Sequence, residues 1–156
     1  MIQNTTHETS SSNSFSSRDI SESVVDIIET VIASLEDNGS AMVSHTNEGY
    51  LWRFCYGSVN VFVQLTGTTD EDTLIVWSSV LKLPVQDEAR LMRMLLEMNW
   101  ADTFEARFCI LGDEIVISTT RMVADLTAGE ISRNITIVAT IADEQDDRLA
   151  AEFQGE

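Results

Sequence analysis

The apolar positions between residues 91 and 122 change from a helical period to a strand period. The pattern first follows helical spacing and stops at Asp102. From Phe104 to Ile110 apolar and polar residues alternate, and after Gly112 a β-branched run resumes at residues 115–117. The segment therefore predicts an amphipathic helix followed by a hairpin, and the apolar sides of these elements must be covered. The helical stripe consists of Leu91, Met92, Leu95, Leu96 and Met98.

A second helix is predicted near the N-terminus, from a capping box at Asp19 and Glu22 to a glycine cap at Gly39. Val25 and Ile32 form an extra apolar stripe, about 100° around the axis from the main one. Either the helix is wedged between a sheet and another helix, or Val25 and Ile32 face a partner. The main stripe is formed by Val24, Ile28, Val31 and Leu35.

Four strands are predicted between these two helices, at residues 41–46, 50–56, 59–65 and 74–83. Apolar residues occur on both faces of these strands, which indicates that the second face of the sheet is also partly covered. Pro84 ends the last strand, and Asp87 is placed to cap the middle helix.

A third helix is predicted to start at a capping box formed by Thr127 and Glu130. Beyond the acidic residues 143–147, Leu149 and Phe153 either extend this helix or fray. The apolar stripe of the helix is formed by Ile131, Ile135, Val138 and Ala142.

Together these elements predict an α+β fold with an antiparallel sheet, in the order α-β-β-β-β-α-β-β-α. Residues 1–18 are rich in Ser, Thr and Asn, and we expect a disordered tail there. A single domain is expected over residues 19–150, followed by a frayed acidic C-terminus at 151–156.

The 156 residues include 9 Lys and Arg against 26 Asp and Glu, a net charge of -17. Such a surface repels nucleic acids and anionic membranes, so binding through phosphate neutralisation is not expected. The charge either serves solubility alone or belongs to an acidic carrier that keeps an apolar or basic client soluble.

The cysteines and the N-terminus indicate a cytoplasmic, soluble protein. Cys55 and Cys109 lie within strand patterns and are predicted to be reduced core residues. The first residues lack the pattern of a signal peptide, and no segment reaches the roughly 18 apolar residues of a membrane helix.

The sequence contains no recognisable catalytic or metal-binding pattern. His7 lies in the tail and His45 stands alone in a strand, so neither a catalytic triad nor an HExxH motif can be formed. The cysteines lack zinc-ligand spacing, and the acidic turns lack that of a calcium loop. We expect no catalytic residues, no cofactor and no metal, and therefore a protein that is not an enzyme.

Two further clusters are candidates for binding. Met92, Met94 and Met98 are expected in the core, with a dimer or client surface as the alternative, because methionine suits surfaces that accept several partners. A second hypothesis is a small-molecule site or an unfamiliar enzyme, with a pocket between the sheet and the middle helix. That pocket would be lined by Trp52, Trp77 and Trp100.

The segment from Ile20 to Ala142 resembles the YbjN-like family and its cyanobacterial relatives, which have the fold of type III secretion chaperones. Five short stretches carry the resemblance: Leu95-Leu96-Glu97-Met98-Asn99-Trp100, Ala106-Arg107-Phe108, Gly112-Asp113-Glu114, Ile115-Val116-Ile117-Ser118 and Leu126-Thr127.

The resemblance implies a small acidic α+β domain, often a homodimer, that binds protein segments and catalyses nothing. Chaperones of this fold hold partly unfolded effectors along apolar surface on the first helix and the sheet, where Val25 and Ile32 fall in this chain. We therefore expect a chaperone-like or regulatory domain with a protein partner, and no nucleic acid or membrane partner.

Overall fold

The computed structural model describes residues 17–155, with side chains from Val24 to Gly155. The predicted α+β class and element order are confirmed. Six strands form one antiparallel sheet in the order β1-β2-β3-β4-β6-β5. The elements are α1 (Ser17–Leu35), β1 (Met42–Thr46), β2 (Gly49–Tyr56), β3 (Val59–Leu65), β4 (Thr73–Lys82), α2 (Glu88–Ala101), β5 (Arg107–Leu111), β6 (Glu114–Met122) and α3 (Ala128–Phe153).

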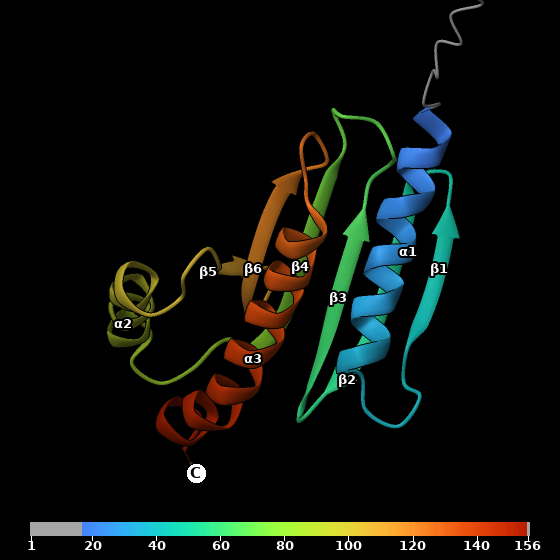
Figure 1. The fold of residues 1–156 in the computed structure, drawn as a ribbon. Helices are drawn as coiled ribbons and strands as arrows, with labels where there is room; N and C mark the ends of the chain where they lie inside the picture. The colour runs from blue at the N-terminus through green and yellow to red at the C-terminus, as the bar shows by residue number, and fades with distance from the viewer. Residues whose placement is uncertain (1–16, 156) are drawn as a thin grey trace, which may run out of the picture.

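Two helices cover one face of the sheet and pack against each other (Figure 1). α3 lies over β4 and its neighbours, and α1 lies beside α3 on the side of β1 and β2. Ile28 of α1 and Ile135 of α3 are fully buried in the resulting core. Every second residue of β3 is buried in the same core, as expected for a strand with one covered face. α2 lies away from these helices, at the β5 end of the sheet (Figure 1).

The turn between β2 and β3 is tied to α3 through the acidic stretch at 143–147. Asp143 Oδ1 accepts hydrogen bonds from Ser58 N at 2.8 Å and Ser58 Oγ at 3.0 Å, and Asp146 Oδ2 accepts from Ser58 Oγ at 2.7 Å. Gly57 has a φ of 53°, and a Cβ there would lie 2.0 Å from Asp143 Oδ1. The turn therefore needs glycine both for its left-handed backbone and for its close approach to α3.

The helix ends differ from the predicted domain limits. α1 begins at Ser17, two residues before the predicted start of the domain. Residues 1–16 of the predicted tail, and the side chains of the Asp19–Glu22 capping box, lie outside the described residues. At the other end, α3 continues to Phe153, into the stretch expected to fray. Phe153 is 2% exposed, and Arg90 Cζ lies 4.3 Å from its ring centre, so the last helical turn is packed.

The strand after the middle helix begins later than predicted. β5 starts at Arg107, whereas the alternating pattern placed a strand from Phe104. Phe104 is exposed and has a φ of 53°, and Ala106 N donates to Thr103 O at 2.9 Å to close a turn. The alternation at residues 104–106 therefore belongs to a tight turn, in which Thr103 and Ala106 are buried.

Candidate partner-binding surface

The five residues predicted to bind a partner do not form one surface. Val25 and Ile32 lie on α1, whereas the three methionines lie on α2 at the other end of the sheet (Figure 1). Ile32 is 2% exposed, so it packs in the core and does not stand out from the helix surface. α1 packs against both the sheet and α3, and these two contacts account for its second apolar stripe.

The other four residues are partly buried against the core. For Met92, Met94 and Met98 this agrees with the expectation that methionine fills irregular core space. Val25 likewise packs on the core beside the fully buried Ile28. None of these four side chains projects from the surface, so none offers an exposed apolar contact to a partner.

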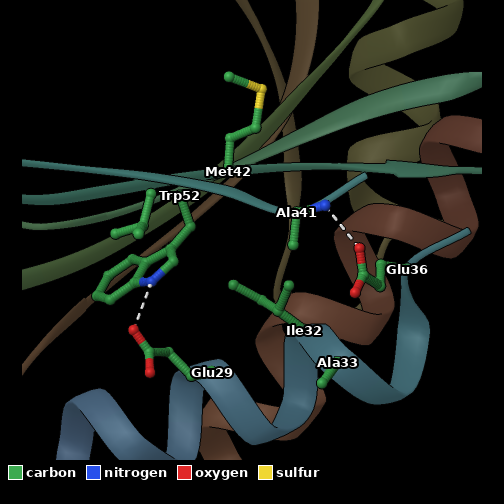
Figure 2. A pocket seen from close by; sticks show the side chains of 8 residues that line it. Glu29, Ile32, Ala33, Glu36, Ala41, Met42 and Trp52 are labelled. Atoms are coloured by element: carbon green, nitrogen blue, oxygen red, sulfur yellow. Dashed lines mark hydrogen bonds between the residues drawn. The ribbon is translucent and has the colours of Figure 1, made fainter. Parts of the chain in front are cut away.

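A groove of about 290 Å³ instead runs between the C-terminal half of α1 and the edge of the sheet. Ile32 and Trp52 project into it from the helix and from β2 (Figure 2). Ala33 lines its helix side and Val43, which is exposed, lines its β1 side. The remaining lining residues are Glu29, Glu36, Ala41 and Met42.

Two hydrogen bonds hold α1 and the sheet edge at a fixed separation (Figure 2). Trp52 Nε1 donates to Glu29 Oε1 at 3.3 Å, and Ala41 N donates to Glu36 Oε2 at 2.6 Å. Both carboxylates therefore stand at the rim of an otherwise apolar groove.

β1 forms the outer edge of the sheet beside this groove. Its five residues are all exposed, and among residues 17–155 it pairs with β2 alone. Cys55 N donates to Ser40 Oγ at 2.8 Å, which shows that the odd-numbered amides of β2 point toward β1. With Met42 opposite Arg53, alternation directs the backbone groups of Val43 and His45 away from β2, toward solvent. The groove thus lies directly beside backbone donors and acceptors at an open strand edge.

The predicted pocket lined by three tryptophans is wrong. Trp52 is buried toward α1, Trp77 lies on the opposite face of the sheet, and Trp100 is 94% exposed at the end of α2. The three rings occupy separate parts of the molecule. The small-molecule hypothesis therefore loses the cavity on which it depended.

The histidine and the cysteines of the strands do not meet to form a reactive site. The His45 ring stacks on Tyr50, with ring centres 4.3 Å apart. Cys55 is half-buried, and Cys109 is exposed rather than in the core as predicted. The atoms around its sulfur still exclude some water, and this desolvation raises the pKa of the Cys109 thiol, which lowers its thiolate fraction. Within residues 17–155 no three His, Cys, Asp or Glu side chains are grouped closely enough to hold a metal ion.

A family model described as "Putative bacterial sensory transduction regulator", YbjN, matches residues 25–151. The chain belongs to the YbjN family. The match spans α1 to α3 and so includes both sides of the groove. No match was found among curated proteins.

Solved structures of similar fold support the architecture. The ExsC-ExsE complex contains a chain with 14% identity and a TM-score of 0.52, and the match covers 82% of this chain and 94% of that one. The HopA1-SchA chaperone-effector complex gives 7% identity and a TM-score of 0.55, with coverage of 80% and 93%. At these identities the similarity establishes the shared fold. None of the helices described for this chain has the length and hydropathy needed to span a bilayer.

Proposed function

We propose that this YbjN-family protein is a non-enzymatic, chaperone-like or regulatory domain that holds an extended apolar segment of a partner protein. The segment lies along β1 and places alternate side chains in the groove between α1 and the sheet edge. The observation that carries this proposal is the juxtaposition of the open β1 edge with an apolar groove.

The backbone of β1 supplies the first part of the binding energy. An extended peptide can add to an exposed edge as a further strand, and its main chain then bonds to the unpaired groups. Val43 and His45 present such groups on an edge whose residues are all exposed. Natural sheets commonly protect their edges, so an unprotected edge beside an apolar groove indicates a place for a partner strand.

The groove supplies selectivity for apolar side chains. Successive residues of a strand point to opposite faces, so every second residue of the added segment would point toward α1. There it would meet Ile32, Ala33 and Trp52. A segment with large apolar residues at alternate positions therefore fits best.

The charges at the rim favour basic residues at the ends of that segment. Glu29 and Glu36 each use one carboxylate oxygen in a bond within the chain, and Lys or Arg of a partner would pair with the other. The net charge of -17 attracts a basic segment over longer distances and speeds its association.

The test is fluorescence anisotropy with a labelled twelve-residue peptide that alternates Leu and Ser between terminal lysines. Its control is a peptide of the same composition with the alternation scrambled. Ala33→Lys puts a long cation into the groove, and Ser34→Lys adds the same charge at the next helix position, outside the lining residues.

We expect Ala33→Lys to weaken binding of the alternating peptide by about tenfold or more, which corresponds to about 1.4 kcal/mol. Ser34→Lys should leave the affinity close to that of the unmodified protein. Circular dichroism spectra that overlay for all three proteins establish that the fold is kept. Equal binding of both peptides, or equal loss in both variants, would contradict the proposal.

A further inference from the structure

A row of three aromatic rings runs along the sheet edge beside the groove. The His45 ring of β1 stacks on the Tyr50 ring of β2, with ring centres 4.3 Å apart and planes at 17°. Tyr50 stacks in turn on Trp52, with centres 5.4 Å apart and planes at 8°. Trp52 donates to Glu29 of α1, so the row lies on the face of the sheet that the helices cover. The row therefore begins in the groove and ends at the outermost strand.

His45 is the ring of this row that lies nearest to solvent. It lies directly opposite Tyr50 in the β1–β2 pairing, and it is exposed, whereas Trp52 is buried. One face of the His45 ring lies against Tyr50, so the other face points away from β2, beyond the edge of the sheet. No strand within residues 17–155 lies on that side of β1 (Figure 1). The outer face of the His45 ring is therefore accessible to a partner.

A segment that adds to β1 would place a side chain against this outer face. Residues directly opposite each other on neighbouring strands have their Cβ atoms about 5 Å apart, on the same face of the sheet. The residue that pairs with His45 from outside therefore stands where a further ring of the row would stand. Alternate residues share a face, so the residue two positions along lies opposite Val43 and enters the groove.

Carboxylates flank the row and determine which planar group fits it. Glu29 lies at the Trp52 end, and Glu48 lies in the turn that joins β1 to β2, beyond the His45–Tyr50 pair. Among the side chains described from Val24 to Gly155, no cation pairs with either carboxylate. Aromatic faces and unpaired carboxylates both attract a cation, so the site favours a group that is planar and positively charged.

We propose that the partner segment carries an arginine opposite His45, two residues from the apolar side chain that enters the groove. This inference rests on the proposed function and names the side chain by which the partner is recognised. A guanidinium is planar and stacks on aromatic faces, and its N–H groups remain free to bind a carboxylate such as Glu48. Lysine carries the same charge on a compact ammonium that has no flat face to stack.

The arginine and the apolar residue together fix the register of the segment. The backbone of an edge strand does not discriminate between registers by itself, because every non-proline residue offers the same donor and acceptor. A slip of one residue turns every side chain to the opposite face of the sheet. The arginine would then leave His45, and the apolar side chains would leave the groove at the same time.

The test compares twelve-residue alternating Leu and Ser peptides in which the first or the last Leu is replaced by Arg or by Lys. Both ends are tried because a segment can run either way along β1. Arg and Lys carry the same charge, so the ratio of their Kd values isolates the contribution of stacking. We expect the Arg peptide to bind about threefold more tightly than the Lys peptide at one of the two ends, the size of effect expected at an exposed ring.

Substitutions at His45 assign this preference to the ring. His45→Leu removes the ring and should bring the two Kd values together, whereas His45→Phe keeps a ring and should keep the preference for Arg. Ser44→Leu changes the neighbouring residue, whose side chain lies on the opposite face of the sheet, and should also keep the preference. Both positions are exposed, so circular dichroism spectra of the three variants should overlay that of the unmodified protein.

The outcomes separate this inference from the proposed function. Equal affinity for the Arg and Lys peptides at both ends would overturn the inference and leave the proposed function standing. A preference for Arg that persists in His45→Leu would do the same. If none of the alternating peptides bound the unmodified protein, including the one without a replacement, the proposed function would be contradicted and this inference with it.

Discussion

The side-chain amide of Asn99 binds both backbone groups of Phe108. Asn99 Oδ1 accepts from Phe108 N at 2.7 Å, and Asn99 Nδ2 donates to Phe108 O at 3.3 Å. The amide thus takes the place that a neighbouring strand would occupy along β5. One edge of the sheet is closed by α2 in this way, whereas nothing within residues 17–155 pairs with the outer side of β1.

Asn99→Ala should lower the free energy of unfolding by about 1–3 kcal/mol, because it leaves the amide and carbonyl of Phe108 without partners. Urea denaturation measures the change. Asn99→Asp keeps the acceptor and loses the donor. Its free energy of unfolding should therefore lie between those of Asn99→Ala and the unmodified protein. An Asn99→Ala variant as stable as the unmodified protein would show that the α2 contact contributes nothing to the fold.

Phe153→Ala should cost about 3–5 kcal/mol, the range for removing a fully buried aromatic side chain. Phe153 is 2% exposed and also carries the Arg90 guanidinium over its ring. Gln154→Ala, at the exposed position that follows, should change stability by less than about 0.5 kcal/mol. Thermal or urea denaturation measures the loss of stability in each variant. Equally small losses in both would mean that this end of α3 is not part of the core.

Glu130 makes stability depend on pH. The Thr127 amide and then the Arg121 guanidinium hold the pKa of Glu130 below its ordinary value of 4.5. A lowered folded-state pKa adds stability above pH 4.5, which is lost as the pH falls through the folded pKa. Glu130→Gln should therefore be less stable than the unmodified protein at about pH 7, with a difference that shrinks toward about pH 3. Denaturation at both pH values measures the difference in stability between the two proteins. The same difference at both pH values would contradict the lowered pKa of Glu130.

The fold could be predicted because each element carries a complete local signal. The Thr127–Glu130 capping box forms as the spacing indicated, with Glu130 N donating to Thr127 Oγ1 at 3.2 Å and Thr127 N to Glu130 Oε2 at 3.0 Å. Asp87 likewise caps α2 through Arg90 N. Such interactions join residues three positions apart, so the spacing alone reveals them.

The groove could not be predicted because it depends on which elements become neighbours. Glu29 and Trp52 are 23 residues apart, and nothing in the helix or strand pattern shows that they meet. The place of Ile32 stayed open in the sequence, because a helix with two apolar stripes fits either a partner or a second core contact. One feature of the sequence could have pointed to the edge beside the groove. It is the short predicted strand at 41–46, whose position before a hairpin is compatible with the edge of a sheet.

The central claim is that a partner segment adds to β1 as a strand. Amide hydrogen exchange, followed by NMR with and without the alternating peptide, tests it residue by residue. We predict slower exchange at Val43 and His45, whose amides point to solvent, and little change at Met42 and Ser44, which pair with β2. Val43→Pro, which removes one of the outward amides, should weaken binding, whereas Val43→Thr should not. Binding of the peptide with unchanged exchange at Val43 and His45 would contradict the account.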